Sequence, residues 1–242
     1  MRPILSLPFL PFTLSSKPPA FILAGDSTTA IQSPNGGGWG NGFLSFLNPP
    51  AWGVNKGHNG ATTASYVTDG DWDTVEGLVS ADEEKYSAYV TIQFGHNDQK
   101  NTSGVSLDEY QRNLEMLTGE VRRLGGVPLL VTPLTRRTFT SAHTVSDSLH
   151  DQRLATIAAA KATNTTYLDL NEASRTYVDA IGEKAAHEYN LNPDDDTHLN
   201  AWGSVVFGRM VADLLLEKES GLESWIRENR TLTALIEAGL PA

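Results

Sequence analysis

FILAGDSTT, residues 21–29, places a polar turn directly after four apolar residues. The apolar run Phe21–Ala24 predicts a short buried strand, and Gly25 allows the backbone to turn sharply behind it. Because ligands and chemistry collect beyond the carboxyl ends of strands in open α/β sheets, Ser27 is a candidate nucleophile. Asp26 and Ser27 are equally typical of the N-cap of a following helix. This segment alone leaves both interpretations open.

Four further segments predict strands, and helical patterns separate them. We expect strands at 51–55, 88–94, 127–132 and 166–170, and helices at 40–47, 61–66, 71–80, 107–124, 147–162, after 170 to 186, from 200 onward and at 222–238. The polar and basic segment 135–144 predicts a surface loop. Because parallel strands need crossover connections, this alternation predicts an α/β fold with a five-stranded parallel sheet, covered on both faces and flavodoxin-like in strand order.

The length of the chain, 242 residues, fits one domain of this kind. We expect that domain to span residues 1–242, with residues 1–20 as an N-terminal extension and residues 219–242 as a C-terminal helical cover.

The formal charge of −11 disfavours nucleic acid as a partner, since an acidic surface repels phosphate. No apolar stretch has the length of a membrane span. The sequence does not define the oligomeric state, and a monomer is favoured.

The absence of cysteine excludes disulfides, thiolate metal sites and a cysteine nucleophile.

Arg2 followed by an apolar run has the charge order of a signal peptide, but three prolines interrupt residues 4–12 and no clear cleavage site follows. Sequons begin at Asn101, Asn164 and Asn229, a number close to what chance produces. Localisation therefore stays open between secretion and the cytoplasm.

Five residues at one predicted sheet edge could act together in acyl transfer. Ser27 needs an adjacent base, which His198 can provide. Asp195 lies three residues before His198 and can fold back onto the other ring nitrogen, which would fix the tautomer. The backbone N–H groups of Ser27 and Gly60 and the side-chain amide of Asn97 would supply three donors to an oxyanion.

Each of these residues also has a structural explanation. The acidic run Asp194–Asp196 is compatible with a solvated loop, a helix N-cap or a cation site, although its ligand spacing is irregular. His198 alone fits a surface or capping histidine, and Asn97 alone fits a turn. The other histidines show no metal-ligand spacing, so no metal is expected. Three aromatic residues could stack on a sugar, but we expect all three in the core: Trp39, Tyr66 and Trp202.

The order of these blocks resembles that of the SGNH (GDSL-type) hydrolases. The blocks are Gly25-Asp26-Ser27, Gly60, Gly95-His96-Asn97-Asp98 and Asp195-Asp196-Thr197-His198. The Gly-Asp-Ser-Thr form and Gly38-Trp39-Gly40 are most similar to the rhamnogalacturonan acetylesterase branch. The resemblance covers residues 21–203. It implies a three-layer α/β/α fold and an ester hydrolase that uses neither metal nor cofactor.

The resemblance also implies a role for each matched residue. Ser27 would be the nucleophile, His198 the base and Asp195 the orienting carboxylate, chosen by the family's D-x-x-H spacing. Ser27, Gly60 and Asn97 would form the oxyanion hole. Unlike the secreted plant-cell-wall enzymes, this chain has no cysteines and no convincing signal peptide.

We therefore expect a serine esterase that removes acetyl or other small acyl groups from a carbohydrate such as pectic rhamnogalacturonan. The substrate, an acylated carbohydrate or small ester, would be its partner. One alternative is a broad-specificity short-chain carboxylesterase or lipase. A second alternative, from another class, is a non-catalytic carbohydrate-binding protein on the same fold.

Overall fold

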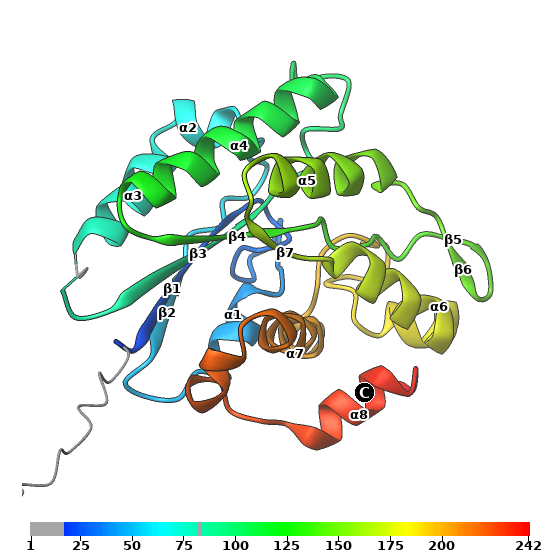
Figure 1. Cartoon of the computed structure of the whole chain (residues 1–242). Helices are drawn as coiled ribbons and strands as arrows, with labels where there is room; N and C mark the ends of the chain where they lie inside the picture. Colours follow the sequence, from blue (N-terminus) through cyan, green and yellow to red (C-terminus); the bar gives the residue numbers. More distant parts are fainter. Residues whose placement is uncertain (1–16, 82–83) are drawn as a thin grey trace, which may run out of the picture.

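Five parallel strands form the central sheet of the computed structural model, which describes residues 17–81 and 84–242 (Figure 1). The strand order is β2-β1-β3-β4-β7, which confirms the predicted flavodoxin-like arrangement. The strands are β1 (Pro19–Gly25), β2 (Trp52–Asn55), β3 (Ser87–Gln93), β4 (Val127–Val131) and β7 (Thr166–Leu168). All five predicted strands are present.

Strand β1 is buried along its whole length. It pairs with β2 on one side and with β3 on the other, with Ala24 opposite Ile92 and Gly25 opposite Gln93. A strand covered on both faces needs apolar residues at every position rather than at alternate ones, which explains the continuous run from residue 21. Its carboxyl end therefore places the turn at Asp26 between the ends of β2 and β3.

Helices cover both faces of the sheet, as Figure 1 shows. The side chains of Ile22 and Ala24 pack in a core under one helical layer, and those of Phe21 and Leu23 pack in a second core under the other. The first layer contains α2 (Ser65–Thr68), α3 (Asp71–Ala81), α4 (Leu107–Arg123) and α5 (His150–Ala162). The second contains α1 (Gly40–Leu44), α6 (Leu170–His187, kinked at Gly182), α7 (Ala201–Lys218) and α8 (Arg230–Glu237). This is the expected three-layer α/β/α fold.

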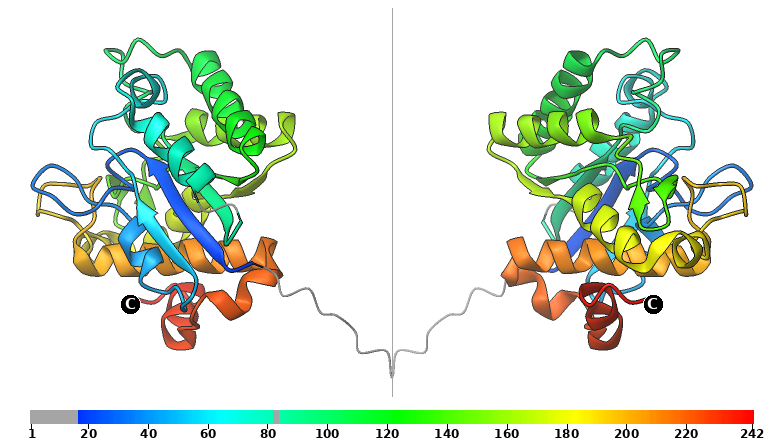
Figure 2. Two further views of the ribbon diagram at one scale, coloured as in Figure 1. Left: turned by 90° about the vertical axis from the view of Figure 1, so that its left-hand side faces the viewer. Right: turned by 90° about the vertical axis from the view of Figure 1, so that its right-hand side faces the viewer.

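The C-terminal segment is divided rather than being one helix over 222–238. A 3₁₀ helix, η1 (Ser220–Trp225), is followed by extended backbone at Ile226 and then by α8, whose first turn is capped by the Asn229 side chain. Figure 2 shows α8 lying against α7.

The expectation that Trp202 lies in the core is wrong: its side chain is 51% exposed, and its Nε1 donates to the backbone carbonyl of Ala242.

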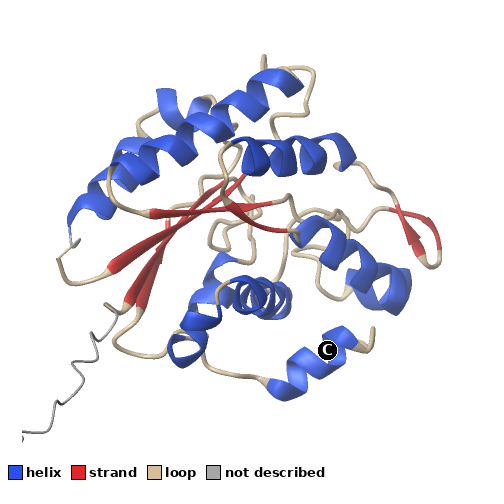
Figure 3. Cartoon of the chain, in the orientation of Figure 1, coloured by secondary structure: helices blue, strands red, loops and turns tan. Residues whose placement is uncertain are grey.

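The segment 135–144 differs from the surface loop that its polar composition predicts. Figure 3 shows a small hairpin apart from the main sheet, made of β5 (Phe139–Ser141) and β6 (Thr144–Val145). Arg137, just before it, is fully buried. Its Nε donates to Asn190 Oδ1 at 2.5 Å and its Nη2 to the His198 carbonyl at 2.7 Å, which offsets part of the cost of burial, although Nη1 has no hydrogen-bond partner among the described residues.

The N-terminal expectations lie mostly outside the described residues. This holds for the signal-peptide pattern and for most of the extension assigned to residues 1–20, although Pro19 and Ala20 belong to β1. Of the helices in the described part of the chain, none combines the length and the apolar character that crossing a membrane requires.

Candidate active site

The turn after β1 positions Ser27 without starting a helix. The Asp26 carbonyl accepts hydrogen bonds from the N–H groups of Thr29 and Ala30, and the Asp26 carboxylate accepts from the N–H and hydroxyl of Thr28 at 2.9 and 2.7 Å. The next helix begins only at Gly40. The helix-cap interpretation of this segment is therefore wrong, and Asp26 instead shapes the turn that carries Ser27.

Ser27, His198 and Asp195 form one hydrogen-bonded chain. His198 Nε2 lies 2.8 Å from Ser27 Oγ. On the other side of the ring, His198 Nδ1 lies 2.9 Å from one carboxylate oxygen of Asp195 and 3.1 Å from the other. The structure thus brings together three residues that are 171 and 3 positions apart in sequence. With Nδ1 protonated and donating to Asp195, Nε2 is free to accept the serine proton.

The Asp195 carboxylate is held by backbone donors as well as by the imidazole. The N–H groups of Thr197 and His198 donate to its Oδ1 at 3.0 and 2.9 Å. Burial alone would raise the pKa of Asp195, but the hydrogen bonds from His198 and Thr197 outweigh burial and hold this pKa below its usual range. Asp195 is therefore ionised at neutral pH.

The loop that carries His198 lies beside the loop that follows Ser27, as the side views in Figure 2 show. The N–H of Leu199 donates to the carbonyl of Gly37 at 2.8 Å, which ties the two loops together. The His198 carbonyl accepts from Arg137 Nη2 and from the N–H of Leu191. Three separate segments thus fix the backbone next to the imidazole.

Gly60 and Asn97 reach the same site from the loops after β2 and β3. Gly60 has a φ of +85°, which favours glycine, and a Cβ there would meet no protein atom within 4 Å. Asn97 is buried, and its side chain is held at two points. Its Nδ2 donates to the Ala61 carbonyl at 3.0 Å, and its Oδ1 accepts from Lys100 Nζ at 2.6 Å. One amide N–H of Asn97 stays available for a ligand.

These residues surround a small polar cavity of about 220 Å³. Its lining is Ser27, Asn35, Gly60, His96, Asn97, Lys100, Arg136, Thr197 and His198. All predicted site residues line it except Asp195, which bonds to the far side of the His198 ring. The sequence patterns did not point to Asn35, Lys100 or Arg136, because their loops approach the site only in the folded chain.

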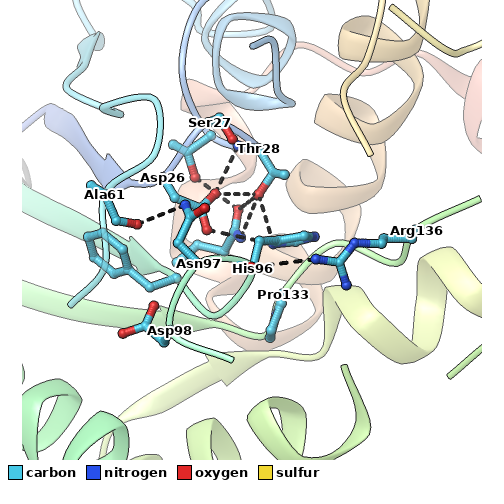
Figure 4. Close-up of polar contacts among 12 residues, drawn as sticks. Asp26, Ser27, Thr28, Ala61, His96, Asn97, Asp98, Pro133 and Arg136 are labelled. Carbon is cyan, nitrogen blue, oxygen red and sulfur yellow. Dashed lines mark hydrogen bonds and ion pairs between the residues drawn. The ribbon is translucent and has the colours of Figure 1, made fainter. Parts of the chain in front are cut away.

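A buried polar network lies beneath the turn that carries Ser27 (Figure 4). His96 Nδ1 lies 3.6 Å from Asp26 Oδ2 and 3.5 Å from Thr28 Oγ1. Burial lowers the pKa of His96, although the neighbouring Asp26 opposes that shift. Gln93 joins the network, since its Nε2 donates to Thr28 Oγ1 and its Oε1 accepts from Trp39 Nε1, each at 2.8 Å.

Two of the aromatic residues are core, as expected. Trp39 and Tyr66 are both fully buried.

The acidic run 194–196 does not converge on one point: Asp195 faces His198, whereas Asp196 Oδ1 lies near Asn190 and His187. Within residues 17–81 and 84–242, no group of three or more His, Asp or Glu side chains is placed to hold a metal ion. Independence from metals and cofactors stays a prediction.

Known proteins are similar to this chain in sequence and in fold. Residues 23–205 match the GDSL-like lipase/acylhydrolase family. The chain is 27% identical over 215 residues to a rhamnogalacturonan acetylesterase of Bacillus subtilis strain 168, which covers 83% of this chain and 90% of that protein. It is 28% identical over 218 residues to a probable rhamnogalacturonan acetylesterase of the same strain, which covers 85% of this chain and 97% of that protein.

A solved structure supports the architecture. The crystal structure of the Bacillus subtilis protein YXIM superimposes with a TM-score of 0.73 at 23% sequence identity over 87% of this chain. This chain spans 59% of that longer one. At this level of identity the likeness shows the shared fold.

Proposed function

Because the chain belongs to the GDSL-like lipase/acylhydrolase family, we propose that it is a serine ester hydrolase with Ser27 as nucleophile, His198 as general base and Asp195 as the orienting carboxylate. The observation that carries this proposal is the 2.8 Å contact between Ser27 Oγ and His198 Nε2, with Asp195 on the opposite ring nitrogen. We further propose that residues 17–242 act as one catalytic domain and that no metal takes part.

The proposed reaction uses this geometry. His198 Nε2 takes the proton of Ser27 as Oγ attacks the ester carbonyl, and the ionised Asp195 stabilises the imidazolium that forms. The N–H groups of Ser27 and Gly60 and the free amide N–H of Asn97 receive the oxyanion. His198 then protonates the leaving alcohol, which gives an acyl-enzyme, and later activates the water that hydrolyses it.

The substrate we propose is an acetyl or similarly small acyl ester on a carbohydrate. The curated relative with 27% identity is a rhamnogalacturonan acetylesterase, so a pectic polysaccharide or oligosaccharide is the leading candidate. The cavity supports a small acyl group, because it measures about 220 Å³ and none of the described residues that line it has an apolar side chain. A lipase site needs apolar surface to accept a long acyl chain.

An acetate-release panel tests the proposal. Acetylated rhamnogalacturonan, acetylated xylan and 4-nitrophenyl esters of increasing chain length are compared with wild type and Ser27→Ala. We expect acetate from a carbohydrate and a steep loss of rate beyond short acyl chains, with turnover absent in the folded Ser27→Ala protein. A preference for long acyl esters would instead favour the lipase alternative.

The non-catalytic alternative has its own test. A serine-reactive phosphonate is expected to label Ser27, and mass spectrometry of the labelled peptide locates the adduct. Folded wild-type protein that stays unlabelled and releases no acetate would support a carbohydrate-binding protein instead. More than a few per cent residual activity in Ser27→Ala would disprove its role as nucleophile.

A further inference from the structure

Two of the three proposed oxyanion donors lie on loops that the sheet does not join. Gly60 follows β2 and Asn97 follows β3, and β1 lies between these two strands in the sheet. Gly60 is exposed, and its N–H donates to no acceptor among the described residues. The direction of that N–H therefore depends on the residues that flank Gly60.

Three hydrogen bonds join the two loops directly. Asn97 Nδ2 donates to the Ala61 carbonyl at 3.0 Å, a contact drawn in Figure 4. Two more come from Thr63, whose backbone N–H and hydroxyl both donate to Asp98 Oδ1, at 2.8 and 2.6 Å. Ala61 and Thr63 lie one and three residues after Gly60, and Asp98 directly follows Asn97. Each of the two donors is therefore close in sequence to a contact that fixes one loop against the other.

The contact between Thr63 and Asp98 is buried on both sides. Thr63 is fully buried and Asp98 is 2% exposed. Among the described residues, Oδ1 is the only carboxylate oxygen of Asp98 that accepts a hydrogen bond, and Thr63 supplies both of the bonds that it accepts from donors outside its own residue. Hydrogen bonds to a carboxylate are about twice as strong as those between neutral groups. Thr63 cannot move away without leaving a buried charge unpaired, which is costly.

Helix α4 fixes the Thr63 hydroxyl from another side. Asn113 Nδ2, on α4, donates to Thr63 Oγ1 at 2.9 Å. The hydroxyl therefore donates to Asp98 and accepts from Asn113 in one orientation, which uses both of its functions. The loop after β2 is thereby attached to helix α4 as well as to the loop after β3.

We propose that Thr63 and Asp98 are positioning residues for the oxyanion hole, because they hold the Gly60 N–H and the Asn97 amide so that both point to one oxygen atom. This inference rests on the proposed esterase function. Neither residue lines the cavity at Ser27, so both act through the loops that they join. A shift of one loop against the other would leave both donors present but no longer directed to the same oxygen. Since donors fixed in advance stabilise the transition state, that shift would cost rate rather than substrate binding.

Replacing the Thr63 hydroxyl tests this role. Steady-state kinetics on 4-nitrophenyl acetate are measured at pH 8, above the pKa of about 6 to which burial raises Asp98, so that its carboxylate is ionised. We expect Thr63→Val, which nearly keeps the shape of the side chain, to lower kcat by roughly tenfold to a hundredfold with KM changed less than about twofold. Thr63→Ser keeps the hydroxyl and is expected to retain most of the wild-type kcat. Thr91→Val is the matched control, because Thr91 is a fully buried threonine of β3 whose hydroxyl has no partner among the described residues, and we expect it to leave kcat unchanged.

Thr63→Ala covers the case in which valine places a methyl group too close to Asp98 and the protein does not fold. It removes the same hydroxyl without adding a methyl group and is expected to lose kcat to a similar extent. Circular dichroism confirms that each variant is folded. Wild-type kcat in a folded Thr63→Val or Thr63→Ala protein would disprove the positioning role.

A double substitution separates positioning from a general loss of stability. If Thr63 acts by placing oxyanion donors, Thr63→Val costs less kcat in the Asn97→Ala background than in wild type, because one of the donors that it places is already absent. A structural role unrelated to the oxyanion predicts that the two losses multiply. Losses that multiply fully would therefore contradict the inference.

An NMR measurement covers failure of the esterase proposal itself. In the Ser27→Ala background, the signals of the Gly60 N–H and of the Asn97 side-chain amide report the position of both donors without turnover. We expect Thr63→Ala to shift and broaden these signals and Thr91→Val to leave them unchanged. Signals that stay the same in Thr63→Ala would overturn the inference whether or not the wild type releases acetate. Wild type that releases no acetate while these signals respond to Thr63→Ala would instead overturn the proposed function and confirm that the Thr63 contact positions the two groups.

Discussion

Asn97 shows how a single side chain is prepared for one interaction. The Lys100 ammonium holds its oxygen and the Ala61 carbonyl takes one of its N–H groups, which leaves a single donor toward the cavity. A donor fixed in advance costs no reorganisation when charge develops on a carbonyl oxygen. At the scale of one residue, the proposed oxyanion hole therefore depends on contacts outside the four sequence blocks.

Replacing Asn97 tests this role. We expect Asn97→Ala to lower kcat by roughly 10²- to 10³-fold with little change in KM, because the lost interaction forms with the oxyanion rather than with the bound ester. Steady-state kinetics on 4-nitrophenyl acetate measure both constants. A rise in KM with kcat unchanged would show instead that Asn97 only binds substrate.

The choice among three adjacent carboxylates is also testable. Asp195→Asn is expected to lower kcat by roughly 10³- to 10⁴-fold, since an amide cannot favour the tautomer and the imidazolium that the reaction needs. Asp194→Asn, at an exposed position in the same loop, is the matched control and is expected to retain wild-type kcat. The reverse result would show that the D-x-x-H spacing selects the wrong carboxylate.

The order of residue types along the sequence was enough to predict part of this site. Ser27, Gly60 and Asn97 follow strands whose carboxyl ends meet, so strand prediction was sufficient to bring them to one edge. Lys100 and Arg136 were not predictable, because the direction of a surface side chain depends on the loop that carries it. The buried position of Arg137 depends on Asn190, 53 residues away, and no local pattern encodes such a partner.

At the scale of elements, Arg137 joins the segment after β4 to the loop that carries His198. Its backbone N–H donates to the Asp196 carbonyl at 2.7 Å, and its guanidinium bonds to the Asn190 side chain and the His198 carbonyl. Burial lowers the pKa of Arg137 to about 10, with Asp195 and Asp196 opposing that shift, so it stays a cation at neutral pH. A single buried side chain therefore holds the loop that carries the proposed base in place, and we call this contact set the Arg137 brace.

Arg137→Met tests this brace. We expect a loss of about 3 kcal/mol in the free energy of unfolding, because a buried and a partly buried acceptor both lose a charged donor, together with a lower kcat from a less ordered His198. Denaturant unfolding and kinetics on one preparation measure both effects. Arg123→Met removes only an exposed ion pair with Glu76 and is expected to change stability by less than about 1 kcal/mol. Equal effects of the two substitutions would contradict the brace.

Helices and strands with strong local sequence patterns were predicted correctly, whereas those with weak patterns were not. The apolar run of β1 fits only a buried strand. The apolar residues of α4 recur at steps of three and four, so they share one helix face, which buries Tyr110, Leu114, Leu117 and Val121. The hairpin at 139–145 and the break between η1 and α8 depend on neighbours that are distant in sequence. Trp202 is exposed because it lies in the first turn of α7, against the chain end at Ala242 rather than against the sheet.

At the scale of the whole molecule, the sheet edge concentrates buried ionisable groups. Asp26, His96 and Asp98 are at most 3% exposed, and all three lie in the loops that follow β1 and β3. Burying such groups costs stability unless they are paired. Asp26 Oδ1 accepts from Thr28 and Asp98 Oδ1 accepts from Thr63, but among the described residues neither Asp26 Oδ2, which lies 3.6 Å from His96 Nδ1, nor Asp98 Oδ2 accepts a hydrogen bond. The edge that would serve the reaction is therefore also where folding stability depends on pH.

Asp98 makes that dependence measurable. Burial raises its pKa to about 6, even though the N–H and hydroxyl of Thr63 donate to its Oδ1 at 2.8 and 2.6 Å. The folded state thus holds this proton more tightly than the unfolded chain does, so the stabilising effect of protonation is present below about pH 4 and is lost as the pH rises through about 6. Asp98→Asn keeps an oxygen for Thr63 and removes the ionisation. We expect wild type to lose on the order of 3 kcal/mol of unfolding free energy relative to Asp98→Asn between pH 4 and pH 7, measured by denaturant unfolding at each pH. A difference between the two proteins that stays constant over this range would show that Asp98 ionises in the folded protein as it does in the unfolded chain.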